Sequence, residues 1–215
     1  PEWEADKCIQ CGKCGFACPH ATIRSFLMDE EEVATAQKIA AENNVELTLK
    51  DPSPAYKGAK EANLKFRIQV STRNCVGCGV CITVCPTKAL SAADVKTQLG
   101  QEPVAEYLYK HTTYKKEYGN NNTEGGVSLM MPYFEVSGSC PGCGEAPYYR
   151  LASQLFGKDM LIANATGCSM IYCSATPTNP FVQDENGEGV AWANSLFEDN
   201  AEYGYGMAIA QSYKS

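Results

Sequence analysis

The chain has 215 residues, of which 44% are hydrophobic, and its 18 Lys and Arg against 25 Asp and Glu give a formal net charge of −7. This acidic balance disfavours binding to nucleic acid and to anionic membrane surfaces. The sequence has no run of 18 apolar residues and no basic, apolar leader, so we expect neither a transmembrane helix nor a secretory signal peptide. We expect a cytoplasmic protein, and because the sequence starts at Pro1 rather than Met and ends without an obvious terminal element, we expect a piece of a longer polypeptide.

The first motif is a compact run of cysteines, Cys8-Ile-Gln-Cys11-Gly-Lys-Cys14-Gly-Phe-Ala-Cys18-Pro19. The chain has 12 cysteines in all, and so many indicate disulfides, zinc sites or iron–sulfur clusters. Disulfide frameworks belong to secreted proteins, and zinc sites typically use two separated C-x-x-C pairs. The C-x₂-C-x₂-C-x₃-C-P spacing is instead typical of [4Fe–4S] ligands. A zinc-binding or buried-thiol domain is the alternative.

An insertion over about residues 25–70 follows this run. Residues Asp29 to Asn44 are rich in Glu, Ala, Gln and Lys, with the acidic residues first, which predicts a surface helix. A docking surface for a partner is the alternative interpretation of this helix. Residues Lys65 to Thr72 alternate polar and apolar side chains, which predicts a strand.

The second motif, Cys75-Val-Gly-Cys78-Gly-Val-Cys81-Ile-Thr-Val-Cys85-Pro86, repeats the first. Two copies of one unit predict a domain with pseudo-twofold symmetry. In two-cluster ferredoxins the fourth cysteine of each run binds the other cluster. We therefore predict a bacterial-ferredoxin-like domain with cluster A on Cys8, Cys11, Cys14 and Cys85 and cluster B on Cys75, Cys78, Cys81 and Cys18.

The residues between these cysteines suit an inorganic core. Four glycines allow the backbone to approach it with positive φ and to point N–H groups at sulfur, namely Gly12, Gly15, Gly77 and Gly79. An apolar layer that limits water is expected from Ile9, Phe16, Ala17, Val76, Val80, Ile82 and Val84. Electron transfer requires no acid–base group here, and the two histidines, His20 and His111, are interpreted as surface residues.

The chain changes character after the second motif. The polar run Gly119 to Gly126 predicts a loop and a domain boundary. Beyond it, the pattern predicts a short strand, a helix, a buried strand that starts an α/β unit, a loop and a helix. These elements cover, in order, Phe134–Val136, Ala146–Phe156, Met160–Asn164, 174–190 and Asp199–Tyr213. We therefore expect an α+β protein with a two-[4Fe–4S] domain over 1–118 and an α/β domain over 119–215.

Four further cysteines lie in this second region. By spacing alone, Cys140-Pro-Gly-Cys143 is equally consistent with a redox dithiol and with half of a metal site. Cys168 and Cys173 follow, and we interpret Cys173 as a buried thiol.

Three longer phrases give more information than the spacing. They are Phe134 to Tyr148 (FEVSGSCPGCGEAPY), Asn164 to Ser169 (NATGCS) and Asn194 to Gly204 (NSLFEDNAEYG). Each phrase closely resembles pyruvate:ferredoxin (flavodoxin) oxidoreductase, and the resemblance covers essentially the whole chain. It implies the ferredoxin-like domain of that family followed by the first part of its thiamine-diphosphate-binding domain.

The resemblance also implies further sites. A third [4Fe–4S] cluster would lie beside thiamine diphosphate, on Cys140, Cys143 and Cys168, with a fourth ligand beyond residue 215. Glu145 and Cys168 would lie against the thiamine cofactor. The Gly-Asp-Gly motif that holds Mg²⁺ and the diphosphate does not occur in these 215 residues. We therefore expect no catalytic residue in this segment, which alone should not decarboxylate pyruvate.

The reaction implied for the parent enzyme converts pyruvate and coenzyme A to acetyl-coenzyme A, CO₂ and two electrons. This segment would pass the electrons to ferredoxin or flavodoxin, within a parent enzyme expected to be a homodimer. One alternative is a free-standing polyferredoxin that only carries electrons. Another is a related oxidoreductase that acts on a different 2-oxoacid.

Overall fold

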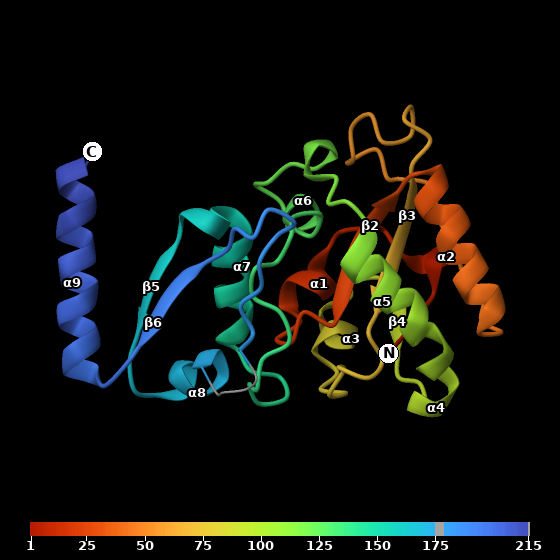
Figure 1. The fold of residues 1–215 in the computed structure, drawn as a ribbon. Helices are drawn as coiled ribbons and strands as arrows, with labels where there is room; N and C mark the ends of the chain where they lie inside the picture. Colours follow the sequence, from red (N-terminus) through yellow and green to blue (C-terminus); the bar gives the residue numbers. More distant parts are fainter. Residues whose placement is uncertain (175–178, 215) are drawn as a thin grey trace.

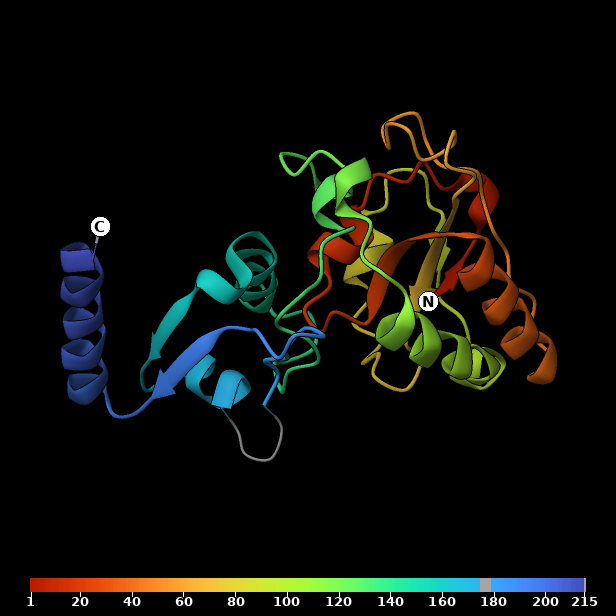
Figure 2. The same ribbon diagram turned by 45° about the horizontal axis from the view of Figure 1, so that its top comes forward.

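The computed structural model describes residues 1–174 and 179–214, which form two regions that meet along the middle of the molecule (Figure 1). The N-terminal region holds both cysteine runs, and helix α9 stands at the far end from it in both views (Figures 1 and 2). The strands are β1 (Glu2–Trp3), β2 (Ile23–Met28), β3 (Lys65–Val70), β4 (Leu90–Ser91), β5 (Leu161–Asn164) and β6 (Ala191–Asn194). The α-helices are α1 (Lys13–Ala17), α2 (Glu30–Glu42), α3 (Val80–Val84), α4 (Val95–Gln98), α5 (Glu102–His111), α6 (Glu124–Val127), α7 (Ala146–Phe156), α8 (Cys168–Ser174) and α9 (Phe197–Lys214). Short 3₁₀ helices cover Ala5–Lys7, Leu99–Gln101, Lys116–Tyr118 and Gly157–Asp159.

The N-terminal region is built from two equivalent halves. Strand β2 pairs antiparallel with β3, and β1 pairs antiparallel with β4. Ile23 faces Val70 in the first pair, and Leu90 faces Trp3 in the second. A shift of 67 residues, the separation of Cys8 and Cys75, carries Ile23 onto Leu90 and Trp3 onto Val70. The predicted pseudo-twofold repeat therefore includes the register of the strands as well as the cysteines.

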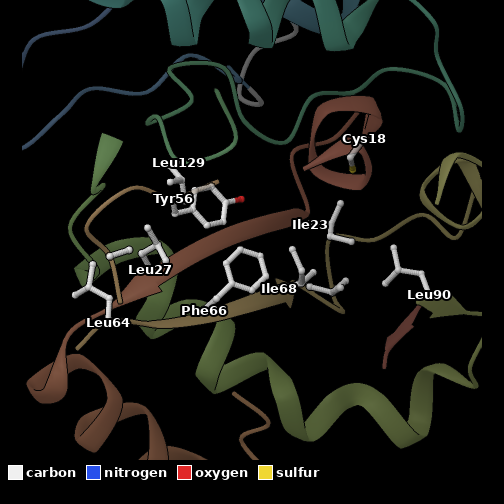
Figure 3. Close-up of a cluster of buried hydrophobic side chains, with 11 residues drawn as sticks. Cys18, Ile23, Leu27, Tyr56, Leu64, Phe66, Ile68, Leu90 and Leu129 are labelled. Atoms are coloured by element: carbon white, nitrogen blue, oxygen red, sulfur yellow. The ribbon is translucent and has the colours of Figure 1, made fainter. Parts of the chain in front are cut away.

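A core of aromatic and aliphatic side chains lies between the paired strands β2 and β3 and the cysteine runs (Figure 3). Phe66 of β3 is fully buried in it and stacks on Tyr56, with ring centroids 5.8 Å apart. Leu27 and Ile68 pack beside Phe66, and Cys18 belongs to the same cluster. The core thus reaches from the insertion to the cysteine that ends the first run.

The insertion forms the predicted helix and strand. Asp29 caps α2 by accepting a bond from the Glu32 N–H at 3.0 Å, and the Glu32 carboxylate accepts one from the Asp29 N–H at 2.9 Å, which is a capping box. Helix α2 buries Ala36 and Ala40 in a second cluster of side chains, which includes Val104 and Leu108 of α5. Helix α5 was not predicted, since its Tyr, Lys and Glu residues mask a short apolar stripe.

Besides α8 and β6, which the sequence pattern does not predict, the second region departs from its sequence prediction in three places. The run Gly119 to Gly126 was predicted to be a loop, but Glu124–Val127 forms α6, capped by the Thr123 hydroxyl, which accepts from the Gly126 N–H at 3.1 Å. Phe134–Val136 was predicted to be a strand, and only a single bridge between Phe134 and Phe181 is formed. Both differences arise because local hydrogen bonds and aromatic packing override weak propensity.

The third departure concerns burial. The predicted strand at Met160–Asn164 exists as β5, which pairs in parallel with β6. The strand was expected to be buried, but Leu161 is 42% exposed, because within the described part of the chain this sheet has only two strands. The helix predicted at Ala146–Phe156 is confirmed with the same bounds as α7, and the helix at Asp199–Tyr213 is confirmed within α9.

The loop predicted over 174–190 falls partly on residues 175–178, which lie outside the described residues. Its first residue, Ser174, instead ends α8, and residues 179–190 contain isolated bridges but no helix or longer strand. Among the helices that the structure describes, none is long and apolar enough to cross a membrane.

Candidate metal centres

The backbone of both cysteine runs turns through the left-handed region. Gly12, Gly77 and Gly79 have φ of 75°, 70° and 78°, as the sequence predicts. Gly15 lies inside α1 without a positive φ, so the prediction was wrong at that position. Gln10, which corresponds to Gly77 in the repeat, instead has a φ of 59°. The turn geometry is therefore shared by both runs even where the residue is not glycine.

A first pocket gathers cysteines from both runs. Its walls include Cys8, Cys11 and Cys14 from the first run and Cys85 from the second. Trp3, Ile68 and Leu90 supply an apolar wall. The structure thus brings together the four cysteines predicted for cluster A, and we call this space pocket A.

A second pocket has the reverse composition. It is lined by Cys75, Cys78 and Cys81 from the second run and by Cys18 from the first. Ile23, Val70, Val80 and Ile82 line it as well. These are the four cysteines predicted for cluster B, and we call this space pocket B. The exchange of the fourth cysteine follows from the antiparallel arrangement of the two halves.

Hydrogen-bond donors converge on the sulfurs. The Gln10 N–H donates to Cys8 Sγ at 3.4 Å, and the Ala89 N–H donates to Cys85 Sγ at 3.2 Å. The Thr22 hydroxyl lies 3.4 Å from Cys18 Sγ. Such bonds stabilise thiolates, the form in which cysteine binds a metal. The donor chemistry of both pockets therefore fits iron–sulfur clusters.

The cysteine pKa values show the effect of crowding. Burial, together with neighbouring Cys8, raises the pKa of Cys14 well above its usual range. Burial and the nearby Cys18 raise the pKa of Cys81 to about 11. Burial also acts to raise the pKa of Cys85, but hydrogen bonds from the backbone and from Thr87 more than offset it, so the net shift is downward. Without a cationic metal, four such thiolates would repel one another.

The expected apolar layer is only partly formed. Five of its predicted members are half-buried, of which Val80 and Ile82 line pocket B, namely Phe16, Ala17, Val80, Ile82 and Val84. Ile9 and Val76 line pockets A and B as predicted, but they are 56% and 48% exposed, so they shield the pockets from water only in part.

Pocket A has a cover that the sequence did not reveal. A Cβ built on Gly12 would meet the Glu124 carbonyl oxygen at 2.6 Å, so α6 lies directly on this turn. The Tyr56 hydroxyl donates to the Gln10 carbonyl at 2.9 Å, and Gln10 Nε2 donates to the Asp51 carbonyl at 2.7 Å. The insertion and α6 therefore both close over the first cysteine run.

The two histidines differ. His111 is exposed, as predicted. His20 was predicted at the surface but is only 2% exposed, and its Nε2 donates to the Ser139 carbonyl at 2.9 Å. The error has a physical cause, because the second region covers this part of the first run. His20 follows Cys18 by two residues and Ser139 precedes Cys140, so the bond joins the two cysteine motifs.

The Cys140–Cys143 turn lies against pocket B. The Cys143 N–H donates to the Cys140 carbonyl at 3.0 Å, and Gly142 has a φ of 75°. A Cβ on Gly142 would stand 3.9 Å from Cys78 Cβ and 3.7 Å from Val80 Cγ2. A side chain at position 142 would therefore touch Cys78 and Val80, so this turn lies beside pocket B.

The remaining predicted site residues are less closely gathered. Cys168 is exposed at the start of α8, and no group of three or more His, Cys, Asp or Glu within 1–174 and 179–214 is arranged to hold a single metal ion. Cys173 is fully buried, as predicted. Burial, with the nearby carboxylate of Glu145, raises the pKa of Cys173 to about 12. Glu145 is itself exposed just before α7.

Two buried arginines join the regions, and the sequence pattern indicates neither. Arg24 of β2 forms a 2.8 Å ion pair with Glu135, and its guanidinium lies 4.1 Å from the ring centre of Tyr109. Arg150 of α7 donates to the carbonyls of Phe16 and Cys18 and is 4% exposed. A lone arginine in a helix carries no local signal that it reaches another region, so the three-dimensional arrangement is needed to find it.

Comparison with known proteins agrees with this geometry. The family described as "4Fe-4S dicluster domain" matches residues 7–89, which contain both cysteine runs. Over 98% of its length, the chain is 43% identical to "Pyruvate:ferredoxin oxidoreductase" of Moorella thermoacetica, and it spans 17% of that protein. It is 43% identical over 97% of its length to "Pyruvate-flavodoxin oxidoreductase" of Enterobacter agglomerans, again spanning 17%. A third relative, "Pyruvate dehydrogenase [NADP(+)], mitochondrial" of Euglena gracilis, is 40% identical over the whole chain, which spans 11% of it.

Proposed function

Since this chain is homologous over nearly its whole length to a segment of the pyruvate:ferredoxin and pyruvate-flavodoxin oxidoreductases, we propose that it conducts electrons out of such an enzyme. The parent reaction would be the oxidative decarboxylation of pyruvate with coenzyme A to acetyl-coenzyme A and CO₂. The acceptor would be ferredoxin or flavodoxin. One observation carries the proposal: each of two pockets combines three cysteines of one run with the fourth of the other.

In this proposal pocket A holds one [4Fe–4S] cluster on Cys8, Cys11, Cys14 and Cys85. Pocket B holds the other on Cys75, Cys78, Cys81 and Cys18. Bound there, the clusters supply one-electron carriers. The chain's own part is to provide thiolates, to direct N–H groups at them, and to bury the inner walls so that charges are not screened by water.

The second region would supply the entry point. Cys140, Cys143 and Cys168 would be three ligands of a third cluster, and Glu145 and Cys168 would lie against thiamine diphosphate, with Mg²⁺ held elsewhere in the parent enzyme. The position of Gly142 beside Cys78 and Val80 supports this role, because it places the Cys140–Cys143 turn next to pocket B rather than pocket A. The proposed route therefore runs from the second region to pocket B, then to pocket A, and then to the acceptor.

A chimeric enzyme tests the proposal. The corresponding segment of the Moorella thermoacetica protein would be replaced by residues 1–215 of this chain, and reduction of ferredoxin would be followed with pyruvate and coenzyme A. We expect the chimera to reduce ferredoxin, and we expect Cys18→Ala within it to abolish that reduction. A chimera that binds its full iron yet stays inactive with every acceptor would contradict the proposed route.

A further inference from the structure

The contact between Arg150 and the end of the first cysteine run is made by a buried positive charge. Arg150 lies on α7 of the second region and is 4% exposed. Its two terminal nitrogens donate to the carbonyl oxygens of Phe16 and Cys18, the last of which is a cysteine of pocket B. The guanidinium therefore sits at the point where α1 ends and the chain enters the pocket.

This charge has no carboxylate partner among the ion pairs of the described residues. A buried cation is costly unless an opposite charge compensates it. Arg24, the nearby buried arginine, meets this requirement through Glu135 at 2.8 Å. Arg150 instead bonds the carbonyl of Cys18, a cysteine that would bind the anionic cluster of pocket B. Pocket B itself is thus the source of the counter-charge.

We propose that Arg150 is a positioning residue that fixes the C-terminal end of α1 and raises the reduction potential of the cluster in pocket B. The inference rests on the proposed function, since it concerns the cluster held by Cys18. A [4Fe–4S] cluster with four thiolates is anionic and becomes more so on one-electron reduction. A fixed buried cation therefore stabilises the reduced form more than the oxidised form.

The direction of this effect suits the route. The second region reaches pocket B through the bond of Arg150 to the Cys18 carbonyl, and its Gly142 lies beside Cys78. A higher potential at pocket B favours the arrival of an electron from that side. The residue that tunes pocket B also belongs to the region that would deliver the electron. The reduction potential of the cluster in pocket B therefore depends on α7 being packed against the first cysteine run.

The test is an EPR-monitored redox titration of the 215-residue chain with its clusters assembled without oxygen. Cys8→Ser and Cys75→Ser variants assign the two signals to pockets A and B. We expect Arg150→Gln to move the potential of cluster B to a more negative value and to move cluster A much less. Arg150→Lys, which keeps the charge, should restore most of the shift.

Arg73→Gln is the matched control. Arg73 is an exposed arginine two residues before Cys75, so solvent screens its charge, and its replacement should leave both potentials nearly unchanged. An unchanged cluster B in Arg150→Gln, or equal shifts in Arg150→Gln and Arg150→Lys, would show that the charge of Arg150 does not tune the cluster. Iron content separates the claims: eight irons with an unchanged potential refute only the role of Arg150, whereas a wild-type chain without clusters refutes the proposed function too.

If the Arg150→Gln variant does not fold, a measurement on the wild-type chain tests the proposal instead. With ¹⁵N-labelled arginine, the reduced cluster of pocket B should show hyperfine coupling to arginine nitrogen, and the cluster of pocket A should show a weaker one. Absence of this coupling at pocket B would overturn the proposal.

Discussion

Gly12 and Gly125 meet backbone to backbone, since a Cβ on Gly12 would stand 2.7 Å from the Cα of Gly125. Gly79, which corresponds to Gly12 in the repeat, has nothing within 4 Å of its own Cβ position. The same left-handed turn is therefore covered by α6 in one half and open in the other. This difference separates steric effects from backbone strain.

Gly12→Ala is expected to destabilise the chain more than Gly79→Ala. Both substitutions place a side chain at positive φ, which costs about 1–2 kcal/mol. Only at Gly12 does the new methyl meet backbone atoms that cannot move aside, which adds about 1–3 kcal/mol. Denaturant unfolding of the anaerobic, cluster-loaded chain measures both. Equal losses would show that α6 does not rest on the first cysteine run.

The exchange of ligands between the halves predicts crossed damage. Cys18→Ala should destroy the cluster on Cys75, Cys78 and Cys81, because Cys18 lines pocket B. Cys85→Ala should destroy the cluster of pocket A. EPR of the remaining cluster, with iron analysis, identifies which one is lost. Damage confined to each cysteine's own run would mean that the two sites are independent.

We predict a large loss of stability when the Glu32 carboxylate, in the insertion, is removed. Glu32 is buried and accepts bonds from the Asp29 N–H, the Thr113 N–H and Lys115 Nζ, the last at 2.6 Å. Glu32→Ala leaves the Asp29 and Thr113 N–H groups without this acceptor and removes the shortest ion pair of Lys115, so it should destabilise the chain by about 2–4 kcal/mol. Glu31→Ala, at the exposed neighbouring position, should change stability by less than about 0.5 kcal/mol. Similar values for both variants would contradict the arrangement around Glu32.

The cap of α2 also makes the stability of the chain depend on pH. The Glu32 N–H, and then Lys115 against the opposing effect of burial, lower the pKa of Asp29 in the folded chain. A lowered pKa gives stability that is complete above the unfolded value of about 3.9 and is lost as the pH falls through the folded value. Asp29→Asn should therefore lose less stability than the wild type between about pH 5 and pH 2. Parallel curves for the two chains would exclude this linkage.

The number of irons that the chain binds depends on whether its third group of cysteines holds a cluster. Cys140, Cys143 and Cys168 offer three thiolates, whereas a [4Fe–4S] cluster takes four. We expect anaerobically prepared chain to contain about eight irons and eight sulfides, in two clusters. Twelve irons, or stoichiometric zinc without sulfide, would each contradict this expectation. Hydrogen exchange should show stronger protection in the N-terminal region, because bound metal stabilises the fold around it.

The cysteine runs could be predicted from the sequence because their chemistry demands a fixed spacing. The same spacing gave the exchange of Cys18 and Cys85 between pockets, which the structure reproduces. The surroundings could not be predicted, since they depend on contacts between distant segments. The sequence predicts a surface position for His20, because no residue near it in the sequence indicates the 2.9 Å bond to the Ser139 carbonyl. Arg150 and α6 were missed for the same reason.

The composition of pocket A also bears on how the chain matures during synthesis. Its last cysteine, Cys85, lies 71 residues after Cys14 in the sequence. Pocket B is likewise incomplete until Cys75, Cys78 and Cys81 join Cys18. Neither cluster can gain its full set of protein ligands until the second run has left the ribosome. The first run would emerge as a partly ligated, oxygen-sensitive loop, and delivery of iron and sulfide would be timed to a single late event that closes both halves together.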